Sequence, residues 1–216
     1  MRALALAALL FAGAAHAGAD EWQGWYGGIA AGPAYARSNW YTDAALQPDF
    51  EQVRHNMWGG MAGAQFGYNA VGGPFFVGGE LGLYAADLEQ RKESASVPGN
   101  EQVTNIRNPF YATVRMGFAG SRTLVYVRGG YAHADVELQA TAAGSLAVWE
   151  GHANGWTAGT GFEVRVGPHW SVGLSYDYSR LRATNQDTSN SVGVAVHADD
   201  FTARVHAVLL RANYRF

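Results

Sequence analysis

The chain has 216 residues with 28 glycines, no cysteine, 15 Lys and Arg residues and 18 Asp and Glu residues. A hydrophobic content of 48% excludes a disordered chain, and a formal charge of -3 argues against nucleic-acid binding, which needs a basic face. Because cysteine is absent, disulfides, thiol nucleophiles and thiolate metal ligands are excluded. The length fits one domain or one β-barrel better than two domains.

The N-terminal residues 1–17 are typical of a secretory signal peptide. A basic residue precedes the apolar run 3–11, and small residues end the segment at Ala15-His16-Ala17. The apolar run is too short to span the ~30 Å of hydrocarbon in a bilayer, which argues against a membrane anchor. We predict cleavage after this segment, export from the cytoplasm, a short periplasmic segment at 18–24 and a barrel domain at 25–216.

Apolar residues alternate with a period of two along most of the remaining chain, which predicts strands rather than helices. The predicted strands are 25–35, 58–69, 75–86, 109–118, 123–133, 155–166, 170–180 and 204–216. This makes eight strands, and an even number is typical of bacterial outer-membrane barrels.

The connections between these strands alternate in length. Three are short and contain Gly or Pro, at 70–74, 119–122 and 167–169. Four are long and polar, at 36–57, 87–108, 134–154 and 181–203. Short periplasmic turns and long extracellular loops are the layout of outer-membrane barrels. We therefore expect an all-β fold, an eight-stranded antiparallel up-and-down transmembrane β-barrel with four long extracellular loops.

The two faces of the predicted strands differ in polarity. One face is apolar, with aromatic residues at the strand ends: Trp25, Tyr35, Trp58, Tyr68, Trp170, Tyr214 and Phe216. The other face holds Glu80, Arg115, Arg128, Glu163, Arg165, Asp177 and Arg211. An arginine facing lipid at the bilayer centre costs roughly 2–4 kcal/mol, so we expect these charges to pair inside the lumen. The aromatic residues are expected to form interfacial girdles. Because eight strands enclose just enough room for side chains, we expect no large pore.

Several motifs resemble the small outer-membrane barrels of Gram-negative bacteria, the opacity/porin-like surface proteins related to the transmembrane domain of outer membrane protein A. The motifs are Gly24-Trp25-Tyr26-Gly27-Gly28, Gly63-Ala64-Gln65-Phe66-Gly67-Tyr68-Asn69, Tyr126-Val127-Arg128-Gly129-Gly130-Tyr131-Ala132, Gly159-Thr160-Gly161-Phe162-Glu163 and Asn213-Tyr214-Arg215-Phe216. The resemblance covers residues 22–216 and implies contact with outer-membrane lipids and lipopolysaccharide.

The C-terminal Tyr214-Arg215-Phe216 looks like the signal by which the barrel-assembly machinery recognises this class. One departure from the family is Ser175, where relatives often carry an acidic residue. No periplasmic domain is expected after Phe216, so the resemblance does not imply anchoring to peptidoglycan.

The histidines and carboxylates give little sign of catalysis or metal binding. His16 falls in the signal peptide, and the others lack an i,i+2 or i,i+4 histidine pair: His55, His133, His152, His169, His197 and His206. The pattern His169-Trp170-Ser171 resembles the His-x-Ser pair of outer-membrane lipid A deacylases. However, it falls at a predicted periplasmic turn, far from the lipid A leaflet, and lacks the Asn that follows the Ser. Glu80 and Glu163 share their face with four arginines, which favours a structural network over a general acid–base pair.

We therefore expect a non-enzymatic integral outer-membrane protein without metal or cofactor. It would support envelope integrity and contact an external ligand or host surface through the four long loops. Two alternatives stay open at this point: a small-solute or haem-binding barrel, as some similar surface proteins are reported to be, and a lipid A-modifying enzyme.

Overall fold

The computed structural model describes residues 19–44, 51–93, 101–142, 145–183, 187–189 and 194–216. Its elements are η1 (Ala19–Trp22), β1 (Gly24–Ala44), β2 (Glu51–Gly72), β3 (Phe75–Glu93), β4 (Glu101–Ala119), β5 (Thr123–Ala142), β6 (Ser145–Arg165), β7 (Trp170–Arg182), β8 (Asp187–Ser189) and β9 (Val194–Arg215). Within these ranges, no helix has the length and apolarity needed to cross a bilayer. The predicted signal peptide at 1–17 lies outside the described residues.

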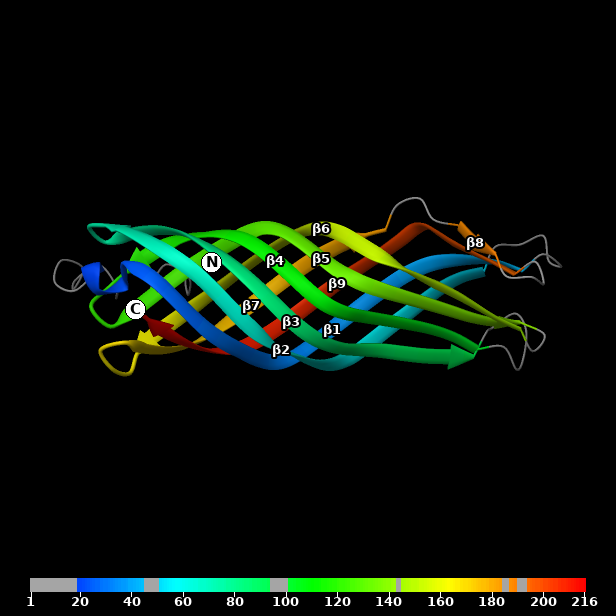
Figure 1. Ribbon diagram of the computed structural model, residues 1–216, viewed down its shortest axis with the longest axis horizontal. Helices are drawn as coiled ribbons and strands as arrows, with labels where there is room; N and C mark the ends of the chain where they lie inside the picture. Colours follow the sequence, from blue (N-terminus) through cyan, green and yellow to red (C-terminus); the bar gives the residue numbers. More distant parts are fainter. Residues whose placement is uncertain (1–18, 45–50, 94–100, 143–144, 184–186, 190–193) are drawn as a thin grey trace, which may run out of the picture.

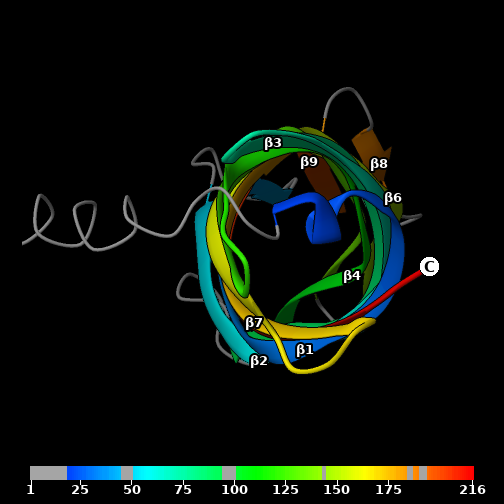
Figure 2. The same ribbon diagram turned by 90° about the vertical axis from the view of Figure 1, so that its left-hand side faces the viewer.

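Eight long strands close into one antiparallel barrel (Figures 1 and 2). Each strand pairs with its neighbour in the order β1 to β7 and then β9, and β9 returns to β1, for example through Tyr26 opposite Arg215. The three-residue β8 pairs with β9 and takes no part in closure. The predicted eight-stranded up-and-down barrel is confirmed.

The short turns lie at one end of the barrel, together with η1 and the C-terminus (Figure 1). The first turn needs a left-handed residue, and Gly73 supplies it with a φ of 60°. The second closes through a hydrogen bond from the Gly120 amide to the Thr123 carbonyl at 2.8 Å. By the layout of outer-membrane barrels, this is the periplasmic end, and the opposite end faces outward.

The prediction of four long loops is wrong, because most of the residues assigned to them are in strands. The ladder between β1 and β2 continues beyond Tyr35 and Trp58 as far as Thr42 and Glu51, and the other predicted loops are also largely strand. Seven of the eight barrel strands have 19 to 22 residues, and β7 has 13. A tilted strand needs only about 9–11 residues to cross a membrane, so a large part of the barrel projects outward.

The physical reason is that the inside-to-outside polarity reverses along each strand. In the part that crosses the membrane, apolar side chains such as Leu81 and Val114 point outward. Beyond Tyr35 and Trp58, polar side chains point outward to water and apolar side chains fill the interior. The larger members of this interior core are Trp40, Met57, Leu88, Ile106, Val136, Leu138, Trp149, Leu181, Phe201 and Val205. The outward side chains of these segments are polar because the strands lie in water. In the sequence alone, the same polarity suggests a loop.

Candidate functional site

A buried carboxylate, Glu80 on β3, is the centre of the polar interior. Its Oε2 atom accepts a hydrogen bond from the Tyr26 hydroxyl at 2.7 Å and from Arg211 Nη2 at 2.5 Å. Arg115 Nη1 lies 3.2 Å from the same oxygen, and Arg128 Nη1 donates to Oε1. Three arginines from β4, β5 and β9 therefore converge on one carboxylate, which must be ionised for each of these charge-assisted bonds.

Two further carboxylates complete the pairing. Arg128 binds Asp177 in a bidentate manner, with Nε to Oδ1 at 2.6 Å and Nη2 to Oδ2 at 2.5 Å. Arg115 Nη1 lies 3.0 Å from Glu163 Oε1. Ser175 takes part by donating its hydroxyl to Asp177 Oδ2 at 3.1 Å. This serine therefore belongs to the same network.

The network is neutral and joins every strand of the barrel. Three arginines balance three carboxylates, and each of the six is at least 93% buried. The two remaining strands contribute Tyr26 from β1 and Asn69 from β2, whose Oδ1 accepts from Arg115 Nε at 3.1 Å. Because an unpaired charge inside the barrel would carry a large desolvation penalty, these ion pairs depend on one another across the lumen.

Of the seven residues predicted for the lumen network, Arg165 lies elsewhere. It ends β6 at the periplasmic rim, where it pairs with Glu21 and donates to the Pro168 carbonyl at 3.3 Å. The expectation of four arginines in one lumen network is therefore wrong. The alternation in sequence places Arg165 on the inward face of β6. It does not show that Arg165 is the last residue of this strand, at the rim of the barrel.

A tryptophan closes the periplasmic mouth, which the sequence analysis did not anticipate. Trp22 in η1 is fully buried, and its Nε1 donates to the Gly120 carbonyl at 2.7 Å. The guanidinium of Arg215 lies 4.6 Å from the centre of the Trp22 ring, within range of a cation–π interaction. Figure 2 shows η1 within the outline of the barrel.

Aromatic pairs occupy two levels of the outer wall. Near the periplasmic end, Trp25 lies 5.1 Å from Tyr68 and Trp170 lies 5.1 Å from Tyr214, between ring centres. At the outer level, the rings of Tyr35 and Trp58 are 4.7 Å apart, and Trp156 and Tyr178 are 5.3 Å apart. On β1 the two levels are separated by the run from Trp25 to Tyr35, close to the roughly 9–11 residues of a membrane-crossing strand. The role of these residues as interfacial girdles stays a prediction.

The motif His169-Trp170-Ser171 does not form a nucleophile and base pair. His169 Nδ1 lies 3.0 Å from the Arg215 carbonyl oxygen at the exposed rim. Ser171 is buried on the inner face, and its hydroxyl donates to Glu163 Oε2 at 3.0 Å. A serine nucleophile must bond to its base, so this geometry gives the motif a structural role.

Two histidines that form no close pair in the sequence lie together in the structure. His133 on β5 and His152 on β6 have ring centres 5.2 Å apart on the outer wall, and Asp135 lies between them. Sequence spacing misses this group because it crosses two strands and includes a carboxylate. His55, in contrast, is buried in the outer part of the barrel, and burial together with the charge of Lys92 lowers its pKa to about 4.

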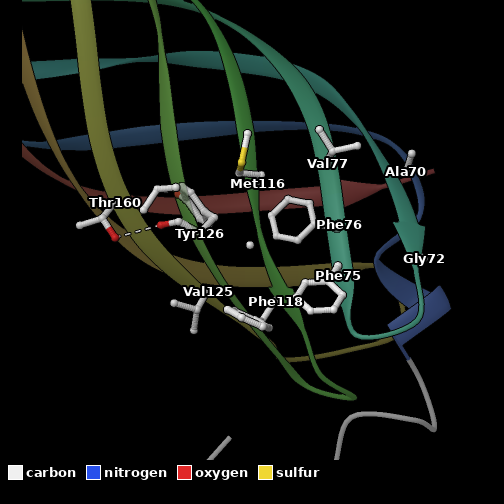
Figure 3. A pocket seen from close by; sticks show the side chains of 12 residues that line it. Ala70, Gly72, Phe75, Phe76, Val77, Met116, Phe118, Val125, Tyr126 and Thr160 are labelled. Atoms are coloured by element: carbon white, nitrogen blue, oxygen red, sulfur yellow. Dashed lines mark hydrogen bonds between the residues drawn. The ribbon is translucent and has the colours of Figure 1, made fainter. Parts of the chain in front are cut away.

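A groove of about 710 Å³ runs along the outer wall near the periplasmic end (Figure 3). It lies between β3, β4 and β5. Phe75, Val77, Met116 and Phe118 line it, and these side chains are exposed on the apolar face. This face meets acyl chains in a membrane, so the groove belongs to the lipid-contacting wall.

Comparisons with known proteins found several similar solved structures. The attachment invasion locus protein Ail of Yersinia pestis is 16% identical, with 89% of this chain and 99% of that chain covered and a TM-score of 0.44. OprG of Pseudomonas aeruginosa is 11% identical, with 90% and 97% covered and a TM-score of 0.49. The outer membrane protease OmpT of Escherichia coli is 8% identical, with 89% and 97% covered and a TM-score of 0.53, a likeness of fold alone.

A search among curated proteins gives no match to this chain. The model of one protein family, described as the outer membrane protein beta-barrel domain, matches residues 3–216. That match takes in nearly the whole sequence, every barrel strand included. The chain therefore belongs to the outer membrane protein beta-barrel domain family.

Proposed function

We propose that this outer-membrane protein is a non-enzymatic structural and surface protein with a closed interior. The observation that carries the proposal is the filling of the barrel at three successive levels. Trp22 covers the periplasmic mouth, the neutral network around Glu80 fills the next level, and the apolar core around Trp40 and Leu138 fills the outer part. An interior of eight strands has room for side chains and little else.

The same contacts argue against hydrolytic chemistry. Glu80 is surrounded by three arginines and Glu163 is bonded to Arg115 and Ser171, so neither carboxylate is available as a general base. His169 and Ser171 bind different partners. Incubating the folded barrel with lipid A and weighing the product by mass spectrometry tests this. We expect no loss of acyl chains, and acyl loss that depends on His169 would contradict the proposal.

The projecting part of the barrel is the surface through which the protein would act outside the cell. Its outward side chains carry both signs of charge, with ion pairs such as Arg91 with Glu101 at 3.2 Å and Arg107 with Glu137. Mixed charge suits contact with the phosphates and sugars of lipopolysaccharide, and with an external ligand or host surface. The strand ladder makes this surface more rigid than loops would be, which would reduce the entropy lost on binding.

Export and assembly complete the proposal. Residues 1–17 would direct secretion and be removed, and residues 18–24 would reach the periplasm, where part of this segment covers the mouth. Tyr214 and Phe216 would then be recognised by the barrel-assembly machinery. The C-terminal side chains suit this role because both point outward from the last strand, where another protein can reach them.

Planar-bilayer recording tests the closed interior directly. The folded full chain is added to a bilayer, and a sixteen-stranded porin, which has an aqueous channel, serves as the positive control. We expect no large steady conductance. A stable open level comparable to that of the porin would overturn the proposal.

A role in envelope integrity is tested in cells. Deleting the gene should raise sensitivity to detergents and to large antibiotics that an intact outer membrane excludes, and the full-length gene should restore resistance. Identical sensitivity of the deleted and parental strains would contradict this part of the proposal.

A further inference from the structure

Three side chains that commonly bind metals meet on the outer wall, just beyond the outer aromatic level. His133 and Asp135 are on β5, and His152 is directly opposite Asp135 on β6. One nitrogen or oxygen atom from each lies within 4.8 Å of the corresponding atoms of the other two. The neighbouring pair toward the membrane is Tyr131 and Trp156, so the cluster lies at the level of the lipid headgroups.

The spacing suits a tetrahedral metal ion. His152 Nδ1 lies 2.9 Å from Asp135 Oδ1, and His133 Nε2 lies 3.9 Å from the same oxygen. Two ligands on a zinc ion with bonds of about 2.0–2.1 Å are separated by about 3.3 Å in tetrahedral geometry. The two observed distances lie on either side of this value, and all three atoms lie within 4.8 Å of one another.

Two neighbouring side chains, Asn154 and Tyr131, orient the His133 ring so that its Nε2 atom is free to bind a metal. His133 Nδ1 lies 2.8 Å from Asn154 Oδ1, and this oxygen also accepts from the Tyr131 hydroxyl at 2.5 Å. Because an amide oxygen only accepts, Nδ1 of His133 carries the proton and Nε2 keeps its lone pair toward Asp135. Such outer hydrogen bonds are typical of histidine ligands in metal sites.

The carboxylate is held in the same way. Asn108 Nδ2 donates to Asp135 Oδ2 at 2.9 Å, which leaves Oδ1 facing the two imidazoles. Asn108 lies within an irregularity in the pairing of β4 with β5 and has a φ of 49°. Its hydrogen bond is also the largest cause that lowers the pKa of Asp135. Arg107 is directly opposite Asp135 on β4, and its guanidinium pairs with Glu137.

We propose that His133, Asp135 and His152 form a binding site for a divalent transition metal ion, with Zn²⁺ as the representative ion. Two imidazoles with one carboxylate favour zinc, copper or nickel over calcium and magnesium, which prefer oxygen ligands. Three protein ligands leave a fourth position for water or an external ligand. The site is independent of the closed interior, because all three side chains are on the outer wall.

The experiment uses the full chain without an affinity tag, folded in detergent micelles and stripped with a chelator. Co²⁺ is added as a spectroscopic probe for tetrahedral coordination, and Zn²⁺ binding is measured by calorimetry. We expect saturable binding of one ion per chain. Calcium should not compete. Absence of saturable Zn²⁺ binding up to millimolar concentration would overturn the site.

Variants separate this site from incidental binding to histidine. Combining His133→Ala with His152→Ala, or making Asp135→Asn alone, should abolish stoichiometric binding, and Asn154→Ala should weaken it about 10–100-fold. The matched control is His206→Gln, since His206 is also on the outer wall and bonds to the Tyr176 hydroxyl at 2.7 Å. Heat-modifiable gel migration verifies that each variant is folded. Equal loss in His206→Gln, or full binding in the double variant, would contradict the assignment.

Discussion

The hydroxyl of Tyr26 reaches Glu80 across an intervening strand, at a distance of 2.7 Å. Tyr26, Gly67 and Glu80 occupy one row of the barrel, on β1, β2 and β3. A Cβ atom at Gly67 would lie 2.4 Å from the Tyr26 hydroxyl. Glycine at this position therefore allows the tyrosine to lie across β2 and join the first strand to the charged network.

The first prediction concerns this glycine. Gly67→Ala should displace Tyr26 from Glu80 and reduce the free energy of unfolding by about 1–3 kcal/mol, the usual effect of overpacking. Gly60→Ala is the matched control on the same strand, because nothing lies within 4 Å of a Cβ atom there. Urea unfolding in micelles measures both. Equal stability of the two variants would show that the row does not constrain the barrel.

The second prediction concerns the charge balance of the interior. Glu80→Gln leaves three buried arginines with two carboxylates, and removing one partner of a buried ion pair costs about 3–5 kcal/mol. We expect a large decrease in the free energy of unfolding. Tryptophan fluorescence in increasing urea measures it. Glu89→Gln removes an exposed carboxylate and should change stability by less than about 1 kcal/mol. A small effect of Glu80→Gln would mean that the three arginines do not depend on this carboxylate.

The sequence predicts the strand number, the closure and most of the interior charges, because lipid imposes one consistent alternation on the crossing segments. It fails where the surroundings change. Outward residues such as Arg37, Arg54 and Asn56 lie in the part of the strand ladder beyond the membrane. The polarity of these residues resembles that of a loop. Trp40 and Met57, in the same segments, are buried inside the barrel. Their inward position becomes clear only once the pairing of β1 with β2 is known.

Contacts across strands are the other part that alternation cannot supply. Alternation assigns Arg165 to the inner face, but its distance from the other arginines depends on the register and on where the interior ends. His152 and Asp135 are 17 positions apart in sequence and directly opposite in the sheet. A spacing search along the chain finds ligands within one strand or helix, so it cannot detect a cluster formed by two strands.

The third prediction is a pH dependence caused by His55. Trp40 Nε1 donates to Thr104 Oγ1 at 3.0 Å, so the Thr104 hydroxyl can donate to His55 Nδ1, which lies 2.9 Å away. This arrangement favours neutral His55, whose pKa is lowered to about 4 in the folded protein. An unfolded histidine has a pKa of about 6.5.

The sign of the effect follows from these two pKa values. Above about pH 6.5 the imidazole is neutral in both states and does not alter stability. Between about pH 6.5 and 4 only the unfolded chain takes up the proton, so stability falls as pH falls, by at most about 3 kcal/mol. His55→Gln should remove this part of the slope in unfolding measured at several pH values. If the variant and the parent lose stability in parallel over this range, His55 is not the cause.

The last prediction separates recognition of the C-terminus from its effect on stability. The side chain of Phe216 is 74% exposed on the outer wall, and its backbone amide donates to the Trp25 carbonyl at 3.1 Å. Deleting Phe216 should therefore leave refolding in detergent nearly intact but cause unfolded protein to accumulate in the periplasm of cells. Phe118→Ala is the control, because Phe118 is another exposed ring near the periplasmic end and should assemble normally. Normal heat-modifiable migration of the truncated protein from cells would refute a role as assembly signal, and failure to refold in detergent would assign the defect to stability.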